Sequence, residues 1–288
     1  MNTMFLRRTC LLVLLFVFLA QAMTVASRRV PRDPEEPWPR DPDLSAVTDS
    51  YLLELWDDTM VAYRRANPAG SPVSAIQHAT QYTSMPKSQE AQEHLINALA
   101  RALDEEPINW DEVRVILLLM YGGMDPDPRI PALVERLLTL PRPMKMSAAR
   151  NTAYAEATRL LVLQQSDEAA SVLYAATHRE FWGDDPFLTA RRGTGSNTEA
   201  TIIGYRRGAF SLLLNMPPRI AIPYVEKMLE IYPVSYEPEE IVIGTRYDGS
   251  PRVVHDFTHE RIQSGLNHLY TRLAREEQNE GSANGAPQ

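Results

Sequence analysis

The chain has 288 residues, a formal net charge of −8 at pH 7, 22 prolines and one cysteine. Nucleic acids and anionic lipids are bound by basic surfaces, so this acidic balance argues against both as partners. A single cysteine excludes an intramolecular disulfide. A chain of this length can bury a large core, either as one extended domain or as two compact ones.

Residues 1–22 have the pattern of a secretory signal peptide. Arg7 and Arg8 precede an apolar run, Cys10–Leu19, and Ala20-Gln21-Ala22 is a small-residue cleavage site. The run is short for a membrane span, which makes an uncleaved N-terminal anchor the weaker alternative. Cleavage after Ala22 removes the cysteine, and with it any thiol nucleophile or thiolate ligand. We therefore expect a secreted or periplasmic protein with no stable membrane span after cleavage.

Both ends of the mature chain have few of the apolar residues that a core requires. Residues 23–43 are rich in proline and charge, with Trp38 as their one aromatic residue, and predict an extended linker. This linker would act as a solvated tether or as a docking peptide for a groove that accepts prolines. Residues 276–288, with the sequence EEQNEGSANGAPQ, predict a disordered tail. The folded region is therefore expected to span residues 44–275.

Within this region, apolar residues recur at three- and four-residue spacing, which predicts amphipathic helices. Ser88 and Asn109 stand where N-caps are expected, and Gly122-Gly123 marks a helix end. The run Val115–Met120 predicts a helix enclosed on most sides. The predicted helices are Leu44–Ala66, Pro72–Tyr82, Ser88–Leu103, Trp110–Tyr121, Arg129–Leu140, Met146–Gln164, Asp167–Thr177, two within Thr198–Ile231, and Phe257–Arg275.

The two helices within Thr198–Ile231 are predicted to be antiparallel neighbours. Pro217 and Pro218 end the first helix, because a proline has no N–H to donate and its ring obstructs the preceding turn. So short a turn is expected to place the two helices side by side.

An internal duplication connects this stretch with an earlier one. Leu117–Met120, a proline turn and Pro128-Arg129-Ile130 are matched by Leu212–Leu214, a proline turn and Pro218-Arg219-Ile220. The offset of about 90 residues is roughly two units of a helix-pair repeat. The pattern resembles HEAT-like and armadillo-like repeat proteins. The resemblance implies an all-α fold of antiparallel helix pairs stacked as a HEAT-like α-solenoid, with a concave surface that binds a partner. A compact helical bundle is the alternative.

Residues 239–254 depart from the helical pattern. The apolar residues alternate on both sides of Asp248-Gly249, a dipeptide that favours a tight turn, so a small β-hairpin is predicted. The hairpin would cap the end of the helical array or present an edge to a partner.

The long connection His178–Asn197 is the candidate ligand site, because connections of this length are usually functional or flexible insertions. Ser196 and Glu199 fit a capping box, and a helix N-terminus near arginines favours a small anion. The candidate anion- or ligand-binding residues are Trp182, Asp184, Asp185, Arg191, Arg192, Ser196 and Arg206. The alternative is a loop whose aromatic residues cover the core and whose arginines pair with its own acids.

Arg206 is notable because it falls within the apolar face of its predicted helix. A charge in that place needs a partner. Either an acid of the same chain, such as Glu156 or Asp184, or a ligand carboxylate or phosphate would supply it.

No catalytic residue, cofactor site or metal site is predicted. The chain contains no G-x-S-x-G, Walker A or dinucleotide-binding pattern. His255 and His259 could share zinc if a helix began at His255, but ordinary polar residues at a helix start are expected instead. The predicted function is an exported, non-catalytic scaffold or adaptor that binds a protein or peptide. A binder or hydrolase of a small anionic ligand at residues 178–207 is the alternative.

Overall fold

The computed structural model describes residues 42–66, 87–121, 123–141, 147–183, 198–238, 240–245 and 248–284. The chain divides into two compact units, residues 1–40 and 41–288, and all described residues belong to the second. The predicted signal peptide, nearly all of the linker and the helix predicted over Pro72–Tyr82 lie outside the described residues. None of the helices in these ranges combines the length and the apolar character needed to cross a membrane.

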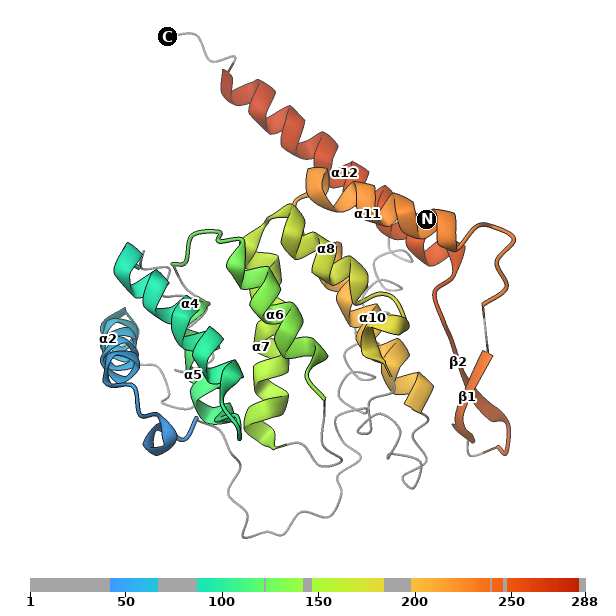
Figure 1. The fold of residues 1–288 in the computed structure, drawn as a ribbon. Coiled ribbons are helices and arrows are strands. Elements are labelled where there is room, and N and C mark those ends of the chain that lie inside the picture. Colours follow the sequence, from blue (N-terminus) through green and yellow to red (C-terminus); the bar gives the residue numbers. More distant parts are fainter. Residues whose placement is uncertain are drawn as a thin grey trace, which may run out of the picture. The chain divides into compact units, whose positions relative to one another are not determined.

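The described part of the chain is mostly helical, as predicted, with one small β-hairpin (Figure 1). The α-helices are α2 (Ser50–Ala66), α4 (Gln89–Asp104), α5 (Trp110–Met120), α6 (Arg129–Thr139), α7 (Ala148–Gln164), α8 (Asp167–Ala175), α10 (Thr198–Leu213), α11 (Pro218–Ile231) and α12 (His259–Asn284). Two short 3-10 helices, η1 (Leu44–Ala46) and η2 (Glu180–Trp182), and two strands, β1 (Glu240–Thr245) and β2 (Pro251–His255), complete the set.

Local side-chain caps set where several helices begin. The Ser88 hydroxyl accepts the N–H of Ala91 at 3.1 Å and starts α4, as predicted. The Asn109 side chain accepts the N–H of Glu112 at 3.2 Å and starts α5. The Asp49 carboxylate caps α2 in the same way, which separates this helix from η1 in a segment predicted to be one helix.

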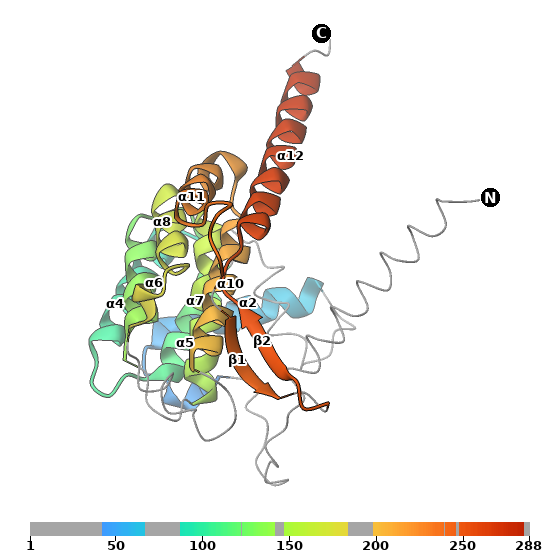
Figure 2. The ribbon, with the colours of Figure 1, turned by 90° about the vertical axis from the view of Figure 1, so that its right-hand side faces the viewer.

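The helices pack in consecutive pairs. α4 packs on α5, α6 on α7, α8 on α10, and α11 on α12. The first helices of the pairs, α4, α6, α8 and α11, also contact one another in that order, and α5, α7 and α10 do the same. α4, α6, α8 and α11 therefore form one layer and α5, α7 and α10 a second, which can be followed from the side in Figure 2.

The prediction that α10 and α11 are antiparallel neighbours is wrong. α10 packs mainly on α8 and α7, whereas α11 packs mainly on α12 and α8. The proline turn between them joins the second helix of one pair to the first helix of the next. A short turn determines how the chain continues, but the fit of the apolar faces determines which helices pack. α5 and α6 have the same relation, so the duplicated segments occupy equivalent places two pairs apart.

One large core cluster runs along these pairs, and Ala176, Trp182, Ile202 and Ala209 form a second, small cluster. α5 lies at the most enclosed point of the large cluster. Every residue from Glu112 to Met120 is buried, which confirms the prediction for Val115–Met120. The reason is that α2, α4, α7 and η1 all pack around α5. The largest fully buried side chains are those of Leu52, Leu95, Leu99, Ile116, Leu117, Leu119, Met120, Ile130, Leu137, Leu160, Leu161 and Phe257.

The C-terminal part agrees with the prediction in the hairpin and differs after it. β1 and β2 pair antiparallel, with Glu240 opposite His255 and Thr245 opposite Pro251. α12 continues to Asn284, beyond the end predicted at Arg275, so the prediction of a disordered tail is wrong for residues 276–284. Glu276, Glu277 and Gln278 favour a helix, and Arg219 of α11 lies 3.5 Å from Glu280, but propensity does not account for the last residues, which include Gly281.

Candidate functional site

Most of the predicted ligand-binding residues cannot be placed. Asp184, Asp185, Arg191, Arg192 and Ser196 lie outside the described residues. Trp182 is the last residue of η2, and Arg206 lies in α10. These two residues are the part of the predicted site that the structure describes.

Arg206 is buried, as its place on the apolar face predicts, with 6% of its surface exposed. Its guanidinium pairs with the carboxylate of Asp256 at 2.9 Å. It also donates to the carbonyl of Thr177 at 2.6 Å and to the hydroxyl of Tyr232 at 2.7 Å. The partner acid thus comes from the same chain, but it is Asp256 and not Glu156, whose carboxylate pairs with Arg159 instead.

The partners of Arg206 come from three parts of the fold. Thr177 follows α8, Tyr232 follows α11, and Asp256 links β2 to α12. Burial raises the pKa of the Tyr232 hydroxyl to about 12, so this group stays protonated. The neighbouring Arg207 donates to the carbonyls of His255 and Asp256. Together, the two arginines attach the return strand of the hairpin to the helices.

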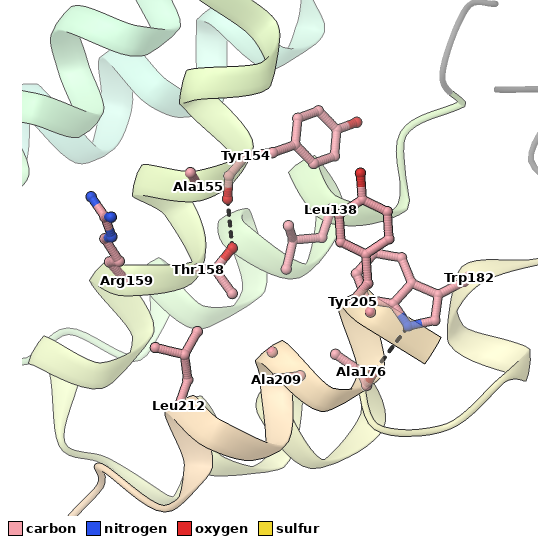
Figure 3. Close-up of a pocket in the computed structure, with 12 residues that line it drawn as sticks. Leu138, Tyr154, Ala155, Thr158, Arg159, Ala176, Trp182, Tyr205, Ala209 and Leu212 are labelled. Atoms are coloured by element: carbon pink, nitrogen blue, oxygen red, sulfur yellow. Dashed lines mark hydrogen bonds between the residues drawn. The ribbon is translucent and has the colours of Figure 1, made fainter. Parts of the chain in front are cut away.

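A groove of about 320 Å³ lies on the other side of α10, between this helix and α7 (Figure 3). We call it the α7/α10 groove. Its wall is mostly apolar, and its charged member is an arginine of α7. The residues that line it are Leu138, Tyr154, Ala155, Thr158, Arg159, Ala176, Trp182, Gly204, Tyr205, Gly208, Ala209 and Leu212.

Aromatic rings form one end of the groove. The Trp182 ring stacks on Tyr205, with ring centroids 5.1 Å apart and planes 23° from parallel. The indole N–H of Trp182 donates to the carbonyl of Ala176 at 2.9 Å, which holds the ring in place. Tyr205 is 38% exposed, so this end offers a fixed aromatic surface to a binding partner.

Two glycines of α10, Gly204 and Gly208, line the same groove one helical turn apart. Apart from its chain neighbours and the backbone of α10 itself, a Cβ added at either residue would meet no described atom within 4 Å. Glycine inside a helix is about 1 kcal/mol less favourable than alanine, so the pair destabilises α10 by roughly 2 kcal/mol. Gly265 of α12 is different, because a Cβ there would lie 2.9 Å from Phe210. Packing within the described chain therefore requires the glycine at Gly265 but not those in the groove.

A guanidinium group marks the end of the groove opposite the aromatic rings (Figure 3). The side chain of Arg159 is 53% exposed, and its Nη1 lies 3.2 Å from the Glu156 carboxylate, which is 13% exposed. Burial raises the pKa of Glu156, and the charges of Arg159 and Arg114 oppose this effect only in part. The groove thus has an aromatic end and a cationic end.

The sequence prediction found Trp182 but missed most of this groove. Gly204 and Gly208, separated by three residues inside a predicted helix, are the signal that could have indicated it, because such glycines usually have a packing or functional reason. The residues opposite them come from α7, about 50 residues earlier, and only tertiary packing brings them together.

The two histidines weighed as zinc ligands have separate surroundings. His255 ends β2, and His259 begins α12, where its Nδ1 lies 2.9 Å from the carbonyl of Tyr232. Over the described ranges, no group of three or more His, Cys, Asp or Glu side chains is arranged to hold a metal ion.

Comparison with protein-family models, with curated proteins and with solved structures gives no match for this chain. The function has to be inferred from the chemistry of the groove.

Proposed function

We propose that the protein is an exported, non-catalytic scaffold of HEAT-like helix pairs that binds a segment of a protein partner in the α7/α10 groove. The order of helix contacts supports the repeat architecture. In such repeats, each helix pair contacts its neighbours, and corresponding helices line a continuous surface for binding. Here α5, α7 and α10 are the corresponding second helices, and the groove lies between two of them.

Export is supported by the sequence of residues 1–22. The basic start, the apolar run and the small residues before the cleavage site are the three parts of a secretory signal. The site of action that fits this signal is the cell envelope or the external medium.

The observation that carries the binding proposal is the open apolar space above Gly204 and Gly208. The chain retains two residues that destabilise α10, although no described side chain occupies the room they leave. Glycine allows another backbone or side chain to approach a helix closely. An apolar side chain from a peptide or a helix of the partner would fill this space and cover Tyr205, as in helix-in-groove recognition.

The alternative function, a binder or hydrolase of a small anionic ligand at residues 178–207, has less support. Arg206 is the buried cation that such a ligand would have to meet. Its guanidinium is bound by Asp256, Thr177 and Tyr232, which leaves little of it for a ligand.

A variant that fills the groove tests the proposal. In Gly208→Leu, the new side chain enters the open space, so we expect unchanged or higher thermal stability and loss of partner binding. Ser211→Leu is the matched control, because Ser211 is exposed on the same helix and does not line the groove. The measurement is affinity capture from envelope extracts with mature wild-type and variant chains, followed by mass spectrometry and reconstitution with the purified partner.

The expected partner is retained by the wild type and by Ser211→Leu but not by Gly208→Leu. Retention by all three chains would show that the partner binds elsewhere. A wild-type chain that retains no protein from any envelope fraction would also contradict the proposal.

A further inference from the structure

We infer that the segment bound in the α7/α10 groove carries a carboxylate, and that this carboxylate binds Arg159 while an apolar side chain covers Gly204 and Gly208. The inference rests on the proposed function, since it names the chemistry of the partner segment in the same groove. The occupant is a peptide segment in which a large apolar side chain stands next to an acidic side chain or a C-terminal carboxylate.

The groove determines where the apolar side chain and the carboxylate of the bound segment would lie. Trp182 and Tyr205 form its aromatic end, and Arg159 lies across the groove from them (Figure 3). Arg159 is the charged residue of the lining, and more than half of its side chain is open to water. A segment that lies along the groove with its apolar side chain over the glycines therefore brings its neighbouring group to a guanidinium. Guanidinium binds carboxylate through paired, charge-assisted hydrogen bonds.

Arg159 can bind such a ligand with little loss of free energy from its present ion pair. Its present bond is to Glu156, three residues earlier on the same helix, at 3.2 Å. Arg159 is exposed on more than half of its side chain, so water and lost side-chain entropy offset much of the attraction in this pair. Glu156 would not be left without a cation, because the charge of Arg114 from α5 also acts on it. This partly buried acid therefore keeps one positive neighbour when Arg159 binds the partner.

The protonation of Glu156 controls how strongly Arg159 is held. Burial raises the pKa of Glu156, while Arg159 on its own helix and Arg114 on α5 lower it in part. The Tyr121 hydroxyl, just after α5, is another titratable group that interacts with Glu156. Burial raises the pKa of Tyr121, and the charge of Glu156 raises it further. When the pH falls through the raised pKa, Glu156 becomes neutral and no longer competes for Arg159. An anion that stays ionised should then bind more tightly at lower pH.

Two fluorescent dyes separate the apolar and anionic contributions. Anilinonaphthalene sulfonate and phenylnaphthylamine have the same aromatic body, and only the first carries an anion. Titration of the mature wild-type chain should show binding of both dyes, and Gly208→Leu should bind neither. The sulfonate is preferred to a carboxylate probe because it remains ionised across the pH range.

The variants then test the arginine. Arg159→Gln should weaken binding of the sulfonate by about three- to tenfold, the range expected for one exposed charge-assisted contact, and leave phenylnaphthylamine unchanged. Glu156→Gln should tighten binding of the sulfonate, because it removes the competitor. Arg136→Gln is the control, since Arg136 is a similarly exposed arginine of α6 that pairs with Asp104 and does not line the groove. It should change neither affinity.

The failures of the two proposals are distinguishable. If Arg159→Gln leaves the sulfonate affinity unchanged while Gly208→Leu abolishes binding of both dyes, the groove is a binding site but the inference about the carboxylate is wrong. If Gly208→Leu binds both dyes as the wild type does, the groove is not the site, and the proposed function fails with the inference. A wild type that binds phenylnaphthylamine and not the sulfonate overturns the inference alone, and one that binds neither dye overturns both.

Discussion

Replacement of Arg206 by methionine is the most informative test of how the fold is held together. Methionine replaces the aliphatic part of the arginine side chain but has no guanidinium. The variant therefore loses the ion pair with Asp256 and the hydrogen bonds to Thr177 and Tyr232. The Asp256 side chain, 13% exposed, is left without its cation. Breaking a buried pair by removing one partner costs about 3–5 kcal/mol, a large share of the roughly 5–15 kcal/mol that stabilises a typical domain. At roughly 2–4 °C per kcal/mol for a chain of this size, Tm should fall by about 6–20 °C.

The assay is thermal and urea unfolding of the wild type, Arg206→Met, Asp256→Asn and the double variant. Because the two side chains interact directly, the double variant should be less destabilised than the sum of the single variants, by at least about 1 kcal/mol. Arg206→Lys should fall between the wild type and Arg206→Met, since an ammonium keeps the charge but lacks the planar set of donors. A Tm within about 2 °C of the wild type for Arg206→Met, together with additive effects, would refute the structural role, because a desolvated pair of this kind must couple. A ligand role for Arg206 would then have to be reconsidered.

Two further predictions concern other parts of the fold. Gly265→Ala should lower stability by about 1–3 kcal/mol, because its Cβ would press on Phe210, whereas Gly204→Ala should raise it by up to about 1 kcal/mol; thermal unfolding that moves both variants in the same direction would contradict the contrast. Burial raises the pKa of Asp49, but its hydrogen bonds with His94 and backbone N–H groups outweigh this effect and lower the pKa below its usual value. Its contribution to stability is thus complete above the ordinary carboxyl pKa of about 3.9 and is lost as the pH falls through the lowered value. Asp49→Asn should be less stable than the wild type at pH 7 and lose less stability on acidification, because asparagine can still cap the helix but has no charge. Parallel stability curves from urea unfolding across the acid range would argue against this charge-dependent contribution.

The local features of the fold could be predicted from the sequence because their causes lie within a few residues. Ser88 and Asn109 start helices by bonding to N–H groups three positions later, and Asp248-Gly249 separates two alternating segments that pair as a hairpin. The enclosure of α5 also follows from its unbroken apolar run. The end of α12 was predicted nine residues too early, because a polar composition was taken to indicate disorder although a polar segment can continue a helix that is already formed.

The candidate site could be predicted only in part. The burial of Arg206 follows from its place on the helical wheel, and Trp182 was selected because it stands in the longest connection. The identity of the acid that neutralises Arg206 did not follow, because Asp256 is 50 residues away in the chain. The groove opposite Arg206 was missed for the same reason, since its two walls belong to α7 and α10.

By itself, the sequence determined most of the helical segments that the structure describes, where several of them begin and which of their faces are apolar, because caps and hydrophobic periodicity act within one or two turns. Only the tertiary structure decided that α10 pairs with α8 and not with α11, that Asp256 neutralises Arg206, and that no described side chain fills the space beside Gly204 and Gly208. Those outcomes depend on the fit of surfaces that are distant in the chain. The pattern of a single helix shows that a face must be buried, but it does not specify which other face will cover it.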